Sequence, residues 1–212
     1  MQIIQDKKAA RAHARQLLSK ISAAQREEYS QKAAASFLNS STYKNASCVA
    51  AFFSLPQEVD TLPVLERAFM DKKRVLLPRV VAGSNEMDFY ELAAPVMGVK
   101  AVSESAATIS RLEAQSEANA WGIREPLESL PLIEKKDIPA DTAILVPGLA
   151  FAKDGSRLGK GKGFYDRYLS ELLAANPAFA ERGKICGYCM ALQILDSVPT
   201  EENDVFMQEV YC

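Results

Sequence analysis

The residues best suited to chemistry lie in one glycine-rich segment, residues 146–170, which has the sequence VPGLAFAKDGSRLGKGKGFYDRYLS. Its alternating glycines allow backbone N–H groups to turn toward an anion, and a helix that begins just after them would add the favourable end of its dipole. Lys160 and Lys162 add mobile positive charges, and Arg157 could hold a phosphate or a carboxylate through two parallel hydrogen bonds. The segment could therefore cradle a phosphate, contact a nucleic acid backbone, or form a basic turn before a helix.

The familiar phosphate-loop patterns do not fit this segment. A Walker loop has four residues between its first glycine and Gly-Lys, followed by Ser or Thr. The stretch GSRLGKG, which begins at Gly155, has three residues there and no hydroxyl follows. GKGKGF also differs from the G-x-G-x-x-G pattern of dinucleotide-binding folds. The spacing alone leaves a phosphate loop and a tight basic turn both open.

Tyr165 and Asp166 favour the phosphate-binding interpretation. A hydroxyl and a carboxylate at the mouth of an anion-binding loop could contact a nucleotide and a Mg²⁺ ion that bridges its phosphates, because Mg²⁺ keeps water ligands and takes few carboxylates. Asp166 could instead be an acidic residue in the first turn of a helix, where it compensates the helix dipole. Taken alone, Asp166 fits either role.

The elements that must position these residues follow a strand and helix alternation. Helical spacing of apolar residues predicts a basic helix from near Asp6 to about Ile21, and the SAAQ capping box at Ser22 predicts a second helix that runs to about Leu38. Strands are then expected within 46–54, 73–81, 86–92, 141–148, 184–191 and 208–212, and helices within 61–72 and 164–176. Residues 94–119 are expected to be loop with some helix. This order predicts an α/β fold with a mostly parallel sheet.

The composition limits the classes of protein to which the chain can belong. The 212 residues are 48% hydrophobic and 25% charged, which predicts one folded domain over residues 1–212. A formal net charge of −2 gives no general attraction to polyanions, so we expect no nucleic acid partner. The chain has no long apolar run and no secretion signal pattern, so a cytoplasmic protein without a membrane partner is expected.

The cysteines and the single histidine are expected to be structural. CGYC at Cys186 to Cys189 has the C-x-x-C spacing, but a metal site would need a second pair or histidines, and His13 is the only histidine. On a strand, this spacing places the two sulfurs on opposite faces. We therefore expect buried, reduced thiols rather than a zinc or redox site, and His13 at the surface.

The glycine-rich segment as a whole resembles the signature of the 5-formyltetrahydrofolate cyclo-ligase family, also called the 5,10-methenyltetrahydrofolate synthetases. Residues 147–169 are similar nearly throughout to P-G-[LV]-A-F-[D]-x-x-G-x-R-L-G-x-G-x-G-[YF]-Y-D-x-[YF]-L. A match of this length is far more specific than a lone glycine loop.

Four further segments resemble family elements in the expected order. They are KKAAR at 7–11, FFSLPQEVDT at 52–61, WGIREP at 121–126 and VPTEENDVFMQEV at 198–210. Each residue in them also has an ordinary structural explanation, such as a solvated helix face or a core aromatic. The resemblance covers the chain from about residue 7 to 212, except residues 94–119.

The resemblance implies a three-layer α/β/α fold related to sugar-phosphate isomerases and CoA transferases. It also implies that ATP and Mg²⁺ drive the conversion of 5-formyltetrahydrofolate to 5,10-methenyltetrahydrofolate, with ADP and phosphate released. The implied catalytic residues are Lys162, Tyr165 and Arg157, and the implied Mg²⁺ ligands are Asp166 and Asp204. The implied ATP site comprises Lys7, Arg11, Arg157, Leu158, Gly159, Lys160, Gly161, Lys162, Gly163, Phe164 and Tyr165. The implied folate site comprises Phe53, Glu58, Trp121, Lys160, Gly161, Lys162, Gly163 and Phe164.

Three other functions stay open at this point. The chain could be a non-catalytic nucleotide-binding relative, an RNA-binding module that uses KGKGFYDRY, or an enzyme of the same family that acts on another pterin-like or thiamin-related substrate. Intact Glu58, Lys162, Tyr165 and Asp166 argue against the first, and the acidic balance argues against the second. The partners expected are small-molecule substrates, and the protein is expected to be a monomer.

Overall fold

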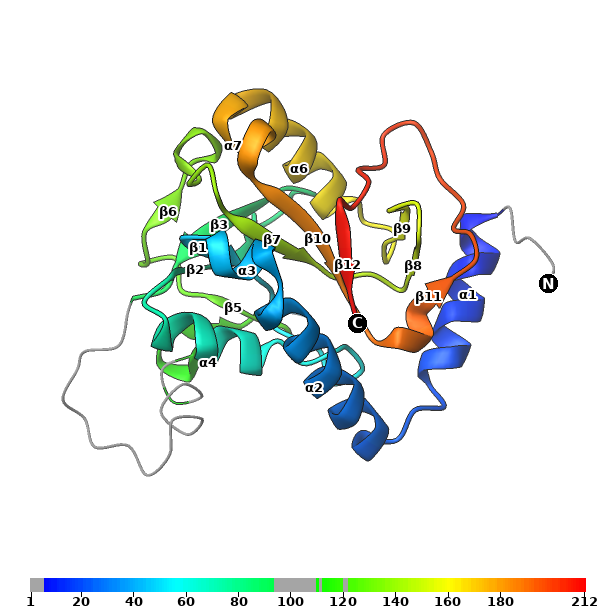
Figure 1. Ribbon diagram of the computed structural model, residues 1–212. Helices are drawn as coiled ribbons and strands as arrows, with labels where there is room; N and C mark the ends of the chain where they lie inside the picture. The colour runs from blue at the N-terminus through cyan, green and yellow to red at the C-terminus, as the bar shows by residue number, and fades with distance from the viewer. Residues whose placement is uncertain (1–5, 94–109, 111, 120–121) are drawn as a thin grey trace.

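The computed structural model describes residues 6–93, 110, 112–119 and 122–212 (Figure 1). Within them, a seven-stranded sheet has the strand order β12-β10-β7-β1-β2-β3-β6. Its strands are β1 (Cys48–Ala50), β2 (Arg74–Val80), β3 (Met87–Glu91), β6 (Leu132–Ile133), β7 (Ala143–Val146), β10 (Lys184–Tyr188) and β12 (Glu209–Tyr211). Pairs from β12 to β2 are parallel, while β3 pairs antiparallel with β2 and β6. The sheet is thus mostly parallel, as the sequence predicts.

Helices cover both faces of this sheet because its central strands are apolar on both sides. On one face, Val49 and Leu145 pack in a cluster with Phe37 and Leu65. These come from α2 (Ala23–Asn39) and α4 (Leu62–Met70), with α3 (Ser41–Asn45) beside them. On the other face, Ile144 packs with residues of α6 (Phe164–Ala175) and α7 (Pro177–Arg182). Figure 1 shows the two sets of helices on opposite sides of the sheet, so the three-layer prediction is confirmed.

A smaller unit beside the main sheet carries the glycine-rich segment. Strands β8 (Ala150–Ala152), β9 (Arg157–Leu158) and β11 (Ile194–Leu195) form a three-stranded sheet. Helix α1 (Lys7–Leu18) packs on it through Ala10 and Ala14, which share a third apolar cluster with Leu149 and Leu158. Figure 1 shows α1 lying beside β8, β9 and β11, outside the three main layers. The N-terminal helix is thereby brought next to a loop near residue 160.

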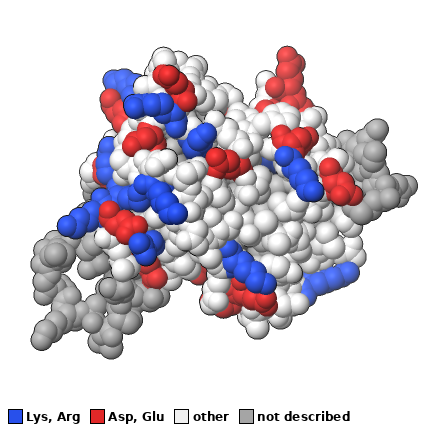
Figure 2. Space-filling model, in the orientation of Figure 1, with Lys and Arg blue, Asp and Glu red and all other residues white. Residues whose placement is uncertain are grey.

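The remaining short elements connect these units. They are β4 (Ser116–Ala118) and β5 (Arg124–Pro126), which pair antiparallel, and the 3-10 helices η1 (Lys135–Asp137) and η2 (Ala191–Gln193). No described helix is long and apolar enough to cross a membrane. On the face drawn in Figure 2, basic side chains lie beside acidic ones rather than in one continuous basic stripe.

Several local predictions are confirmed. The Asp6 side chain accepts a hydrogen bond from Ala9 N and begins α1, and Ser22 and Gln25 form the predicted capping box. Cys186 and Cys189 are buried thiols that belong to the clusters on opposite faces of the sheet. His13 is exposed.

Candidate active site

The glycine-rich loop, residues 159–163, joins β9 to the start of α6. Gly161 and Gly163 have φ angles of +106° and +70°, in the left-handed region that favours glycine. Gly163 is the N-cap of α6 and has no side chain to cap the first turn, so the backbone N–H groups there are open to an anion. Arg167 holds the loop against a neighbouring segment, because its Nη2 donates to the carbonyl oxygens of Lys162 at 2.7 Å and Asn85 at 2.6 Å.

Helix α1 brings one predicted cation to this loop and a second one to the segment that contains Asp204. Arg11 Nε donates to the carbonyl oxygen of Gly159 at 3.1 Å. One turn earlier, Lys7 Nζ lies 2.8 and 2.7 Å from the two carboxylate oxygens of Asp204, and 3.1 Å from Glu201. Lys7 and Arg11 are four residues apart and therefore share a helix face, as the sequence predicts.

Arg157 and Asp166 form a largely buried ion pair at the start of α6. Arg157 Nη2 lies 2.7 Å from Asp166 Oδ1, and Arg157 Nη1 donates to the carbonyl oxygen of Pro147 at 3.2 Å. Arg157 Nε is buried and has no hydrogen-bond partner among the described residues. Asp166 Oδ1 also accepts a hydrogen bond from Val205 N at 3.3 Å. This contact brings the segment that contains Asp204 next to Asp166.

Asp166 and Asp204 each present a carboxylate, the type of side chain that suits Mg²⁺ when a phosphate supplies further oxygen ligands. Among the described residues, no group of three or more His, Cys, Asp or Glu side chains could hold a metal by itself. Each carboxylate already faces a cation, Asp166 facing Arg157 and Asp204 facing Lys7. A metal ion here would therefore be shared with a bound nucleotide, and those ion pairs would have to rearrange.

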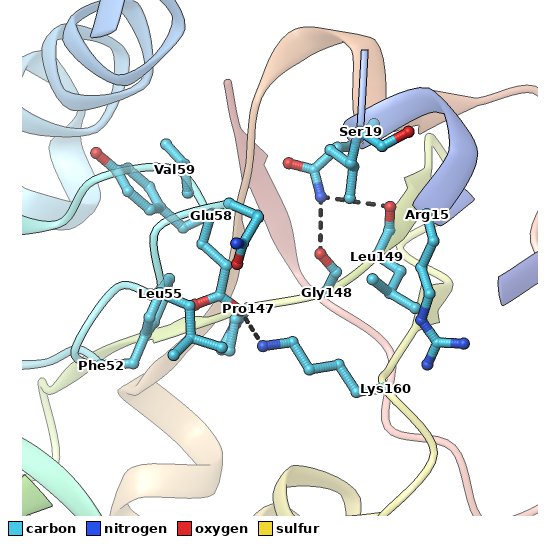
Figure 3. A pocket seen from close by; sticks show the side chains of 14 residues that line it. Arg15, Ser19, Phe52, Leu55, Glu58, Val59, Pro147, Gly148, Leu149 and Lys160 are labelled. Atoms are coloured by element: carbon cyan, nitrogen blue, oxygen red, sulfur yellow. Dashed lines mark hydrogen bonds and ion pairs between the residues drawn. The ribbon is translucent and has the colours of Figure 1, made fainter. Parts of the chain in front are cut away.

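A cavity of about 350 Å³ opens beside the loop (Figure 3). Its walls are mainly apolar, as in most small-molecule sites. The lining residues are Arg15, Leu18, Ser19, Phe52, Leu55, Gln57, Glu58, Val59, Pro147, Gly148, Leu149, Lys160, Tyr188 and Gln193. Lys160 Nζ and Glu58 Oε1 form an ion pair at 2.5 Å, drawn as a dashed line in Figure 3. The second oxygen of Glu58 accepts a hydrogen bond from Leu55 N at 2.9 Å.

Tyr165 carries a hydroxyl group that is buried and without a hydrogen-bond partner among the described residues. Burial raises the pKa of this phenol, and the nearby negative charge of Glu58 raises it further. The phenol is therefore protonated at neutral pH and can donate a hydrogen bond to an oxygen that enters the site. The Arg157 guanidinium lies 5.9 Å from the centre of the Tyr165 ring.

Comparison with known proteins places this arrangement in a family. The model of the 5-formyltetrahydrofolate cyclo-ligase family matches residues 3–212. The chain belongs to the 5-formyltetrahydrofolate cyclo-ligase family. It is 30% identical over 208 residues to the 5-formyltetrahydrofolate cyclo-ligase of Mus musculus, which covers 96% of this chain and 92% of the relative. The expected membership of this enzyme family is thus confirmed.

Solved structures agree on the fold. The chain resembles the 5,10-methenyltetrahydrofolate synthetase of Aquifex aeolicus with a TM-score of 0.70 at 24% identity, covering 97% of this chain and 88% of that one. It also resembles the 5,10-methenyltetrahydrofolate synthetase of Mycoplasma pneumoniae with a TM-score of 0.65 at 20% identity, covering 97% and 98% of the two chains. The mixed α/β fold with its mostly parallel sheet is therefore that of the cyclo-ligases.

The structure brings together most residues that the cyclo-ligase resemblance implies. Glu58 and Lys160 line the cavity. Lys162 lies exposed on the loop, whereas Leu158 is fully buried and could offer a ligand only its backbone. Phe164 is half-buried against the cluster under α6. The loop glycines and the residues of α1 lie around the same corner of the molecule.

One implied folate contact does not line the cavity, and another lies outside the residues that the structure describes. Phe53 packs partly buried against the core and is not among the residues that line the cavity, whereas its neighbour Phe52 is. Trp121 lies outside the described residues, so its expected contact with a pterin ring stays a prediction.

Sequence reasoning did not predict that Arg15, Phe52 and Gln193 line the cavity. The sequence contains a signal for Arg15, since this residue continues the four-residue spacing of Lys7 and Arg11 on one helix face. Gln193 had none that we can identify. Its buried side chain donates to the carbonyl oxygen of Gly148 at 2.7 Å and accepts from Met190 N at 2.8 Å, which holds the Pro147–Gly148 turn at the cavity wall.

Proposed function

We propose that this chain converts 5-formyltetrahydrofolate to 5,10-methenyltetrahydrofolate with consumption of MgATP. One observation supports the proposal in addition to family membership. The ion pair between Lys160 and Glu58 connects an anion-binding loop to an apolar cavity of ligand size. Such an arrangement suits two substrates that must meet, a phosphate donor at the loop and a ring compound in the cavity.

The proposed reaction has two steps. The formyl oxygen attacks the γ-phosphorus of ATP, the bond to the bridging oxygen breaks, and ADP leaves. The N10 nitrogen of the folate then bonds to the formyl carbon, the carbon–oxygen bond to phosphate breaks, and phosphate leaves while N10 loses its proton to solvent. Both steps depend mainly on positioning and charge neutralisation, which fixed cations and hydrogen-bond donors supply.

The loop cations would hold the triphosphate. The N–H groups after Gly163 lie at the start of α6, where the helix dipole favours an anion. Arg11 already contacts the loop, and Lys160 and Lys162 reach from it on flexible side chains. Together they would neutralise the charge that develops on the transferred phosphate.

Tyr165 and Glu58 would act on the folate side. Tyr165 has a buried, protonated hydroxyl with no partner in the described part of the chain, and this group is suited to donate to the formyl or phosphate oxygen. Glu58 presents a carboxylate to the cavity and could accept hydrogen bonds from the N–H groups of the pterin. Asp166 and Asp204 would hold Mg²⁺, which when bound would neutralise phosphate charge.

The test is formation of the cyclised product. Mixing the purified protein with MgATP and 5-formyltetrahydrofolate should produce the absorbance rise of 5,10-methenyltetrahydrofolate, and omission of ATP should prevent it. Intact ATP binding without that rise would contradict the proposal and favour another pterin-like or thiamin-related substrate.

A further inference from the structure

One charged residue of the cavity, Arg15, has no partner among the residues that the structure describes. Among the described residues, the lining contains three charged side chains, Arg15, Glu58 and Lys160, and the last two pair with each other. Arg15 is exposed and makes no side-chain hydrogen bond or ion pair within the part of the chain that the structure describes. The cavity therefore carries an excess of one positive charge, and this charge is available to a ligand.

Arg15 occupies a defined place on α1. Lys7, Arg11 and Arg15 follow at four-residue intervals, so they lie along one helix face with a rise of about 6 Å between neighbours. The first two face Asp204 and Gly159, while Arg15, in the last turn, reaches the cavity beside Leu18 and Ser19. A cation in the last turn also suits the helix dipole, but that role alone does not require a place in the cavity wall.

Arg15 and Glu58 lie on different sides of the cavity. Figure 3 shows the Arg15 side chain on the side of α1 and Leu149, and Glu58 near Leu55 and Phe52, with Lys160 between them. The rest of the described lining is mainly apolar. A ligand that fits has hydrogen-bond donors near Glu58, an apolar ring system against these walls and an anionic group near Arg15.

We propose that Arg15 binds a carboxylate of the glutamyl tail of the folate and so sets the preference for glutamyl substrates. This inference rests on the proposed function. A tetrahydrofolate has a pterin ring with several N–H donors, an aromatic linker and a glutamyl group with carboxylates, which is the order that the cavity would accept. A guanidinium is the side chain best shaped to bind a carboxylate through two parallel hydrogen bonds.

The expected effect is on substrate affinity, not on chemistry. Arg15 is exposed, so its contribution should be that of a partly solvated charged hydrogen bond, about tenfold in KM. The proposed contact is with the tail of the ligand, which takes no part in the reaction, so kcat should stay unchanged. Arg15→Lys keeps the charge but loses the planar pair of donors, and should show an intermediate KM.

The experiment compares two substrates that differ only in the tail. KM, kcat and equilibrium dissociation constants are measured for 5-formyltetrahydrofolate and for 5-formyltetrahydropteroate, which lacks the glutamyl group. The measurements are made on the unmodified protein and on the variants Arg15→Gln and Lys20→Gln. Lys20 is an exposed lysine just after α1 that does not line the cavity, so its variant controls for loss of one positive charge near the site.

Arg15→Gln should weaken binding of the glutamyl compound about tenfold and leave the compound without the tail unaffected, while Lys20→Gln changes neither. Equal effects of Arg15→Gln on both compounds, or no effect on either, would overturn the inference. If the unmodified protein binds both compounds but forms no product, the proposed function fails, and the dissociation constants still decide the role of Arg15. Failure to bind either compound would overturn both.

Discussion

The ammonium group of Lys160 lies 2.5 Å from a carboxylate oxygen of Glu58, so one ion pair links the glycine-rich loop to the wall of the cavity. Lys160 is partly exposed, whereas the Glu58 side chain is 13% exposed. The carboxylate is therefore the more desolvated partner and depends on a cation or on hydrogen-bond donors for its stability. A ligand with N–H donors could provide these when Lys160 turns to a phosphate.

Glu58→Gln should raise KM for 5-formyltetrahydrofolate by about tenfold to a hundredfold, because a charged acceptor for the pterin is lost. Steady-state kinetics at saturating MgATP measure this. Glu181→Gln is the control, since Glu181 is an exposed acid on α7. An unchanged KM in Glu58→Gln would show that the pterin does not use this carboxylate.

Tyr165→Phe should lower kcat by about a hundredfold to a thousandfold, because one donor to a developing negative charge disappears. Its stability should stay equal or rise slightly, since the hydroxyl is buried without a partner among the described residues. Tyr168→Phe is a matched control from the same helix, because Tyr168 also has a buried hydroxyl without a described partner. Turnover measured together with urea unfolding tests this pair, and equal kcat values for the two variants would contradict the role of Tyr165.

Gly155→Ala should destabilise the fold far more than Gly83→Ala. Both glycines have positive φ, +87° and +73°, so both substitutions cost about 1 kcal/mol in backbone strain. A Cβ at Gly155 would also lie 2.2 Å from the backbone oxygen of Met207, whereas a Cβ at Gly83 would have no described atom within 4 Å. We expect a total loss of roughly 3 kcal/mol or more for Gly155→Ala in urea unfolding. Similar losses for the two variants would contradict this packing.

Stability should fall at alkaline pH in part through Cys48. Burial raises the pKa of this thiol from 9.0 to about 12. Because the folded pKa is the higher one, the stabilisation is complete below about pH 9 and is lost as the pH rises toward about 12. At about pH 10 the loss from this thiol should be on the order of 1 kcal/mol.

Cys48→Ala removes this contribution. Its free energy of unfolding should therefore decline less between about pH 8 and pH 10 than that of the unmodified protein, whatever the two values are at neutral pH. Urea unfolding at both pH values measures the two declines. Parallel declines would show that Cys48 does not contribute to the pH dependence.

The sequence predicted features that depend on local chemistry. Asp6 and Ser22 begin their helices as expected, because an N-cap needs only a side-chain acceptor and the N–H groups a few residues later. The loop before α6 was also predictable, since Gly161 and Gly163 occupy backbone conformations that favour glycine. The long motif then identified the family, and the family implied the three layers.

The residues that line the cavity could not be predicted from the local sequence. Strand β1 ends at Ala50, so the alternation that would assign Phe52 and Phe53 to opposite sides has no fixed register after it. Phe52 lines the cavity, whereas Phe53, the residue expected to contact the folate, is not among the described lining residues. The pairing of Glu58 with Lys160 likewise results from the packing of two distant segments, and no periodicity in either one indicates it.

The coupling of ATP consumption to folate cyclisation tests the central claim most directly. ADP and 5,10-methenyltetrahydrofolate are measured in the same reaction, with and without 5-formyltetrahydrofolate. The account predicts equal amounts of the two products, no ADP without the folate, and loss of both in Lys162→Met with the fold intact. ADP release that does not depend on 5-formyltetrahydrofolate, or product formation without ATP, would contradict it.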